Sequence, residues 1–155
     1  MGREQLISKT LLLDLETTRT GRLKHLGAVL GDTVIDIQTG PFRRALKQLD
    51  GLAGGADYIL GHNLLGHDFP ILKAAYPTLQ VLIKPVIDTL YLSPLAFPQN
   101  PYHRLVKDYK LVRATANDPV ADARLAASVF DDQLAQFAGL AENQPRQLDF
   151  FSLLL

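Results

Sequence analysis

The chain has 155 residues, enough for one domain with a substantial core, and its 47% hydrophobic and 21% charged residues exclude an intrinsically disordered chain. The absence of cysteine excludes disulfides, thiolate metal sites and cysteine nucleophiles, and sixteen basic against sixteen acidic residues neither indicate nor exclude a nucleic-acid partner. No apolar run is long enough for a membrane span or a signal peptide, so we expect a cytoplasmic protein with no membrane partner.

The first elements in chain order are predicted to be three β-strands. Residues 10–15 are apolar until an acid appears near the end, which is typical of a buried strand. Residues 23–30 and 33–38 form the next two strands, joined by Gly31-Asp32, a good hairpin turn. We expect these first three strands to pair antiparallel.

Helices and strands are expected to alternate in the rest of the chain. The expected elements are a helix at 41–53 ended by Gly54-Gly55, a strand at 58–60, a helix at 69–76, extended segments at 79–83 and 86–87, and a helix capped by Asp88-Thr89. The last helix has the clearest start, because Asp118 suits the N-cap and Pro119 the first helical position, and its apolar stripe continues to Gly139. This order predicts an α/β fold with a mixed five-stranded sheet flanked by helices.

Two acids near the end of the first strand are the first candidate site. Asp14 and Glu16 lie two residues apart, so both carboxylates point to the same face of a strand. Neighbouring carboxylates repel each other unless a cation neutralises them, and hard cations such as Mg²⁺ prefer carboxylate oxygens. The alternative is a solvated strand end.

Two further acids have ordinary structural explanations when each is taken alone. Asp68 follows residues 61–67 at the start of a predicted helix, where the local sequence favours a capping role. Asp122 lies in the first turn of the last helix, where the helix dipole favours a negative charge. These explanations do not account for the set of four acids.

The segments that carry these acids resemble, in order, the motifs of the DEDD superfamily of proofreading-type 3′–5′ exonucleases. They are Leu11–Thr18 (LLLDLETT), Gly61–Leu72 (GHNLLGHDFPIL) and Asn117–Ala123 (NDPVADA), and Ile87–Thr89 resembles a recurrent strand end of the family. The resemblance covers about residues 8–138 and implies a ribonuclease H-like fold. It divides the chain into an exonuclease domain over residues 1–140 and a tail or linker over residues 141–155.

The resemblance implies hydrolysis at the 3′ end of a single-stranded nucleic acid by two Mg²⁺ or Mn²⁺ ions on either side of the scissile phosphate. Asp14 would bind both ions, and Glu16 and Asp122 would bind the ion that activates water. Asp68 would act mainly through the shell of the other ion. DNA is favoured over RNA as the substrate, although neither motif reads the 2′-hydroxyl.

The resemblance also assigns substrate contacts. Thr17 and Thr18 would present backbone to the terminal nucleotide, and His62 and Asn63 would line the path of the strand. Basic residues after a proline-rich loop are placed for phosphate contacts, with a plain surface segment as the alternative: Arg104, Lys107 and Lys110.

Three departures from the family pattern affect the candidate site. The family's glycine after the paired threonines is delayed here to Gly21, so a different loop is expected at the terminal nucleotide. The second motif has one residue more between His-Asn and its acid than the commonest pattern. The family has a general-base histidine five residues before the last acid, or a tyrosine four residues before it. This chain has Asn117 and Asp118 at those positions, and an amide cannot accept a proton at neutral pH. Either the metal alone activates water, or His67 or His103 reaches in, or the domain is slow or inactive, or the asparagine is an engineered change.

Two rival interpretations stay open. Residues 11–18 also resemble the first motif of haloacid-dehalogenase-like phosphatases, an apolar strand ending in Asp-x-Asp-x-Thr. Glu16 in place of the second Asp, and the lack of a late acidic pair after a lysine, count against that family. The other rival is a degenerate exonuclease-like domain that binds nucleic acid or a partner without cutting, and Asn117 is the reason to keep it.

The tail carries a candidate partner-binding motif. Gln147–Phe151 (QLDFF) resembles the clamp-binding motif Gln-Leu-(Ser/Asp)-Leu-Phe of bacterial replication and repair proteins, whose leucine and aromatic side chains enter an apolar pocket. Pro145 is expected to detach this segment from the last helix. The expected partners are a sliding clamp or, from a looser similarity to helicase-attached exonuclease domains, a helicase. The alternative is that the apolar tail residues fold back onto the domain.

Overall fold

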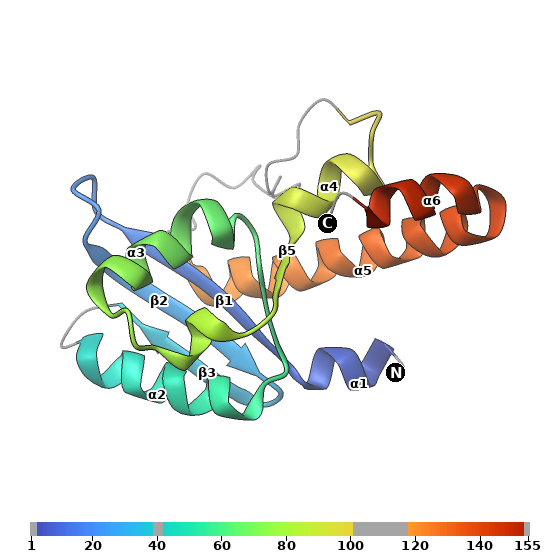
Figure 1. The fold of residues 1–155 in the computed structure, drawn as a ribbon. Coiled ribbons are helices and arrows are strands. Elements are labelled where there is room, and N and C mark those ends of the chain that lie inside the picture. The colour runs from blue at the N-terminus through green and yellow to red at the C-terminus, as the bar shows by residue number, and fades with distance from the viewer. Residues whose placement is uncertain (1–2, 39–41, 101–117, 154–155) are drawn as a thin grey trace.

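The centre of the molecule is a five-stranded mixed sheet with the strand order β3-β2-β1-β4-β5 (Figure 1). The structure is a computed structural model that describes residues 3–38, 42–100 and 118–153. The strands are β1 (Thr10–Thr17), β2 (Leu23–Leu30), β3 (Thr33–Ile37), β4 (Tyr58–Gly61) and β5 (Val86–Asp88). The first three pair antiparallel, β4 pairs parallel with β1, and β5 pairs parallel with β4. The expected α/β class with a mixed five-stranded sheet is therefore confirmed.

Helices cover both faces of this sheet (Figure 1). The α-helices are α1 (Arg3–Ser8), α2 (Phe42–Gly55), α3 (Phe69–Ala75), α4 (Thr89–Ala96), α5 (Pro119–Asn143) and α6 (Pro145–Ser152), and the short helices are the π-helix η1 (Leu64–Asp68) and the 3-10 helix η2 (Gln80–Ile83). The side chains of α2 and α3 pack on one face, and those of α5 pack on the other. None of the helices in the described part of the chain is long and apolar enough to cross a membrane.

Alternate residues of β1 face the two layers. Leu11 and Leu13 belong to the core under α2 and α3, whereas Leu12 packs with Val120 and other residues of α5. Because side chains alternate along a strand, Asp14 and Glu16 follow Leu12 onto the face that α5 covers. The leucines on either side are buried, which fixes the direction of the acids.

Some elements differ from those that the sequence predicts. Residues 80–83 form the helix η2 where an extended segment was expected, because Val81 packs into the core beneath α2 and the Asp50 side chain accepts a hydrogen bond from the backbone N–H of Gln80. Short apolar runs of this length carry no periodicity that separates a strand from a helix. Gly54-Gly55 form the end of α2 itself and do not follow it.

The C-terminal part of the chain is helical. α5 continues past Gly139 to Asn143, and α6 follows after Gln144 and folds back beside the end of α5 (Figure 1). The expectation that Pro145 detaches the tail is wrong, because this proline begins α6. A residue in the first turn of a helix has no helical partner for its backbone N–H, so proline is tolerated there. The clamp-like segment Gln147–Phe151 therefore lies within a helix.

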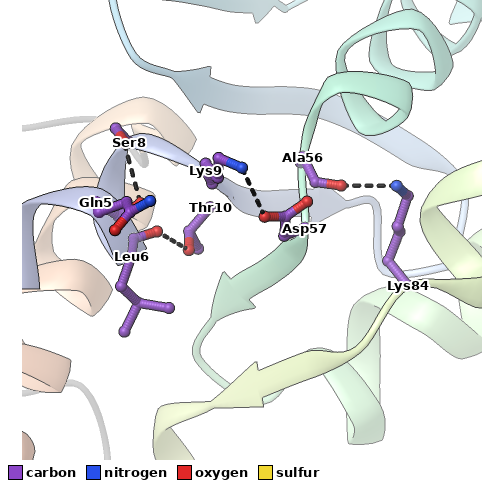
Figure 2. A network of polar contacts seen from close by, with 8 residues as sticks. All are labelled: Gln5, Leu6, Ser8, Lys9, Thr10, Ala56, Asp57 and Lys84. Atoms are coloured by element: carbon purple, nitrogen blue, oxygen red, sulfur yellow. Dashed lines mark hydrogen bonds and ion pairs between the residues drawn. The ribbon is translucent and has the colours of Figure 1, made fainter. Parts of the chain in front are cut away.

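Polar contacts join the beginnings of β1, β4 and β5 (Figure 2). The Lys9 ammonium lies 3.4 Å from the Asp57 carboxylate, and the Lys84 ammonium donates to the carbonyl of Ala56 at 2.6 Å. These contacts are at the end of the sheet opposite to Asp14. They hold the strand starts in place and do not involve the acids.

Candidate functional site

The β1–β2 pairing places the two acids of β1 beside the start of α5. Asp14 lies opposite Gly27, so their side-chain positions share one face of the sheet. A Cβ atom on Gly27 would lie 2.5 Å from the backbone nitrogen of Val120, so only glycine permits this close approach of α5. The first turn of α5, which carries Asp122, therefore packs on the face of β1 that carries Asp14 and Glu16.

Asp68 reaches β1 from the end of η1. Its Oδ1 atom accepts a hydrogen bond from the backbone N–H of Leu15 at 2.8 Å, and the residue is 1% exposed. The capping role that the local sequence favours is wrong, because the Asp68 side chain makes no cap hydrogen bond to α3. The acid of the second motif is instead bonded to the strand of the first motif, next to Asp14.

The environment of Asp68 opposes ionisation of its carboxyl group. Burial raises the pKa of Asp68 well above its usual range, and the negative charge of Asp14 raises it further, while the hydrogen bond from Leu15 acts in the opposite direction. Two neighbouring carboxylates in such a place are stabilised as anions by a cation between them. The donor chemistry at this point therefore fits a divalent metal ion.

The four acids do not form a finished ligand set. Within residues 3–38, 42–100 and 118–153, no three Asp, Glu or His side chains gather in an arrangement that could hold a metal ion. Asp14 and Asp68 are neighbours, whereas Glu16 and Asp122 share their face of the sheet. Glu16 and Asp122 are both half-buried.

The extra residue of the second motif is accommodated by a π-turn. In η1 the backbone N–H of Phe69 donates to the carbonyl of Leu64, five residues earlier, so this turn contains one residue more than a turn of α-helix. The turn carries Asp68 at its end and delivers it to Leu15. The longer spacing is thus compatible with the contact between the two motifs.

His62 and Asn63 follow β4 on its way into η1. Leu60 pairs with Leu12, so the chain leaves β4 beside the acidic end of β1. The His62 Nδ1 atom lies 2.8 Å from the Thr89 hydroxyl, and burial lowers the pKa of His62 below its usual value while the charge of Asp88 opposes that shift. His62 is therefore a neutral hydrogen-bonding group at neutral pH.

Thr17 and Thr18 lie on the other side of the acids from His62, where β1 passes into the β1–β2 hairpin. The pairing is irregular between Glu16 and Thr17, and the backbone N–H of Thr18 donates to the carbonyl of Arg22 at 2.8 Å. A pocket of about 610 Å³ adjoins this hairpin, and its lining combines Arg22 with Phe42 of α2, Ile71 of α3 and Tyr76, which follows α3.

Several predicted residues lie outside the described part of the chain. They are Asn117, at the position of the usual base, His103, and the basic residues Arg104, Lys107 and Lys110. His67, the other histidine proposed as a proton acceptor, is exposed on η1.

The structure adds residues that the sequence alone does not single out. His25 lies opposite Glu16 on the acidic face, with its Nε2 atom 2.5 Å from the Asp36 carboxylate. Gln133 is fully buried and donates to the carbonyl of Thr89 at 2.8 Å. A polar residue three positions after Phe130, within the apolar stripe of the last helix, is a signal that could have identified Gln133.

The sequence matches no protein-family model and no curated protein. We therefore infer a function from the geometry of the acids and from the motifs that carry them.

Proposed function

We propose that this chain is a metal-dependent 3′–5′ exonuclease with a ribonuclease H-like fold, acting on single-stranded nucleic acid with DNA as the expected substrate. The hydrogen bond between the Asp68 carboxyl and the Leu15 backbone carries the proposal, because it brings the acids of two separate motifs together in a buried place. The packing of the start of α5 on Gly27 supports it, since α5 carries the third motif. The mixed sheet with three antiparallel strands supports the proposed fold.

Asp14, Glu16, Asp68 and Asp122 would hold two Mg²⁺ or Mn²⁺ ions. When bound, these ions supply positive charge against the phosphate and make a coordinated water more acidic. The Leu15 N–H fixes the direction of the Asp68 carboxyl through Oδ1, and the buried neighbours of Asp14 hold that side chain on the same face. The chain thus prepares two of the four donors before any ion arrives.

The remaining residues would position the strand. The backbone at Thr17 and Thr18 borders the acids at one rim, and His62 borders them at the other. Because the His62 ring is neutral, it would orient the substrate by hydrogen bonding without adding charge. The pocket beside the hairpin is lined from α2 and α3, which cover the other face of the sheet, and its cation, Arg22, and apolar side chains would suit a phosphate and a base beyond the hairpin.

The second candidate function is binding of a nucleic acid or partner without cleavage. Asn117 in place of a base favours it, and so does the incomplete gathering of the acids among the described residues. The two functions differ in one property, since only the first requires loss of nucleotides from the 3′ end.

Release of label from single strands tagged at the 3′ or the 5′ end tests the proposal, in Mg²⁺ or Mn²⁺. We expect early release of the 3′ label by the natural chain and by Asp57→Ala, which removes an acid at the far end of the sheet. Asp14→Ala should reduce release to background. Equal cleavage by Asp14→Ala refutes the catalytic role of the acids. Strand binding without release favours the second function, and hydrolysis of p-nitrophenyl phosphate alone favours a phosphatase.

A further inference from the structure

The carboxylate of Asp88 joins the starts of two helices in the interior. Asp88 ends β5 beside Gly61 of β4 and is 4% exposed. Its Oδ1 atom accepts hydrogen bonds from the backbone N–H of Asn63 at 2.8 Å and of Leu90 at 3.0 Å. Its Oδ2 atom accepts from the N–H of Leu65 at 3.0 Å. The sequence predicts only that Asp88-Thr89 caps α4, and the bond to Leu90 makes that cap.

The start of η1 depends on this distant acid. The first N–H groups of a helix have no partner within the helix and need an acceptor from elsewhere. Asn63, the residue before η1, makes no side-chain cap bond and has a left-handed backbone with φ of 67°. Asp88 supplies the acceptors for Asn63 and Leu65 that local sequence does not provide.

We infer that Asp88 is a positioning residue, which holds η1 in the π-turn that presents Asp68 to Leu15. The connection runs from the Asp88 carboxylate to the N–H groups at the start of η1, and from the end of η1 through Asp68 to the first strand. Its consequence for cleavage rests on the proposed function. Its consequence for the position of Asp68 does not.

The same corner of the molecule is bonded to α5. Thr89, next to Asp88, accepts through its carbonyl from the side-chain amide of Gln133, and Gln133 also donates to the Ser93 hydroxyl at 2.9 Å. The helix that carries Asp122 and the turn that carries Asp68 are therefore both attached to the junction of β5 and α4. Asp88 stabilises that junction, because its carboxylate accepts hydrogen bonds from the starts of both η1 and α4.

Asp88→Asn isolates the bond to η1. The amide oxygen can still accept from Asn63 and Leu90, whereas the amide nitrogen in place of Oδ2 cannot accept from Leu65. Asp50→Asn is the matched control, because Asp50 also accepts a backbone N–H at the start of a short helix, η2, with one oxygen. If Asp88→Asn does not fold, Asp88→Ser keeps an acceptor for the α4 cap but is too short for η1.

Hydrogen exchange tests the positioning role without reference to activity. We expect the amides of Leu65 and Leu15 to exchange about tenfold faster or more in Asp88→Asn. The Leu65 N–H loses its acceptor, and the Leu15 N–H loses the alignment of the Asp68 carboxyl. Asp50→Asn should exchange at those amides like the natural chain. Unchanged exchange at Leu15 in the Asp88 variant overturns the inference, whether or not the protein cleaves nucleic acid.

Kinetics test the consequence for the proposed reaction. We expect Asp88→Asn to lower kcat about 10–100-fold, as substitutions of residues that orient metal ligands typically do. The Mn²⁺ concentration for half-maximal rate should rise, and KM for the strand should stay nearly unchanged. Added Mn²⁺ should restore part of the rate, and Asp50→Asn should match the natural chain. Natural kcat and metal dependence in Asp88→Asn overturn the inference. A natural chain that cleaves nothing contradicts the proposed function instead, and the exchange result then decides the role of Asp88.

Discussion

Asp68 lies in surroundings that oppose its own ionisation, and this has a consequence for stability. The unfolded chain releases the Asp68 proton near the ordinary pKa of about 4, whereas the folded chain releases it at higher pH. The folded state therefore binds more protons in that interval, and stability falls as pH rises through it. A divalent ion would offset this loss by stabilising the anion.

Asp68→Asn should stabilise the metal-free protein at neutral pH. The amide oxygen still accepts from Leu15, but the side chain no longer has to ionise in a buried place. Melting curves in EDTA should show a higher Tm for the variant at about pH 7, with the difference shrinking toward about pH 4, near the ordinary pKa. A natural chain that is at least as stable as the variant at neutral pH would show that burial of this carboxylate is not costly. The variant should also lose cleavage.

Asn117→His tests whether the missing base limits the rate. A correctly placed general base is typically worth about 10²–10⁴-fold, so we expect faster cleavage by the variant near neutral pH. The gain should decline at high pH, where hydroxide is abundant. Single-turnover rates across pH measure it, and a variant no faster than the natural chain would favour activation of water by the metal alone.

β2 and the start of α5 pack so closely at Gly27 that there is no room for a side chain. Gly27→Ala would force the start of α5 away from β2, because the new Cβ would overlap backbone atoms of Pro119 and Val120. We expect a loss of about 1–3 kcal/mol in the free energy of unfolding, together with reduced cleavage, because Asp122 moves with the helix.

Gly51→Ala is the control for this substitution. Gly51 lies in α2 with no atom near the position of an added Cβ, so alanine there should stabilise by roughly 0.5–1 kcal/mol through helix propensity. Urea unfolding of both variants provides the comparison. A Gly27→Ala protein as stable and active as the natural chain would contradict the close packing of α5 on the acidic strand.

Elements with strong local signals could be predicted from sequence, and elements made by distant contacts could not. The β2–β3 hairpin turn and the Asp118 cap of α5 are local, and both are where the sequence predicts them. η1 depends on the carboxylate of Asp88, more than twenty residues away, so its π-turn has no local signature. The four acids were found because each lies in a motif, whereas Asp88 and Gln133 act through contacts that only the fold creates.

The whole chain combines a mixed sheet with a helical C-terminal region that runs across the expected domain boundary. α5 passes through residue 140, and α6 packs against it, so residues 141–152 are continuous with the fold. Proline both ends helices and begins them, and Pro145 begins one. Because proline is found both after helices and at their first position, the sequence alone indicated a detached tail.

Binding to a sliding clamp would require α6 to leave α5. Leu148 and Phe151 lie three residues apart on α6 and are both half-buried, so neither is fully available to a partner. If the segment is a clamp motif, a labelled peptide of residues 144–155 should bind a bacterial clamp more tightly than the whole chain does. Replacement of Gln147, Leu148 and Phe151 by alanine should abolish binding. Equal binding by the replaced peptide, or none by the natural one, would exclude the clamp as a partner.

Cleavage from the 3′ end with dependence on a divalent ion is the central property that we propose for this molecule. The product ladder from a 5′-labelled single strand, followed over time in Mn²⁺ with Asp14→Ala as the inactive control, measures it most directly. We predict products that shorten one nucleotide at a time from the 3′ end, that stop when EDTA is added, and that are absent with Asp14→Ala. Internal cuts, immediate loss of the 5′ label, or a ladder that persists in EDTA would contradict it.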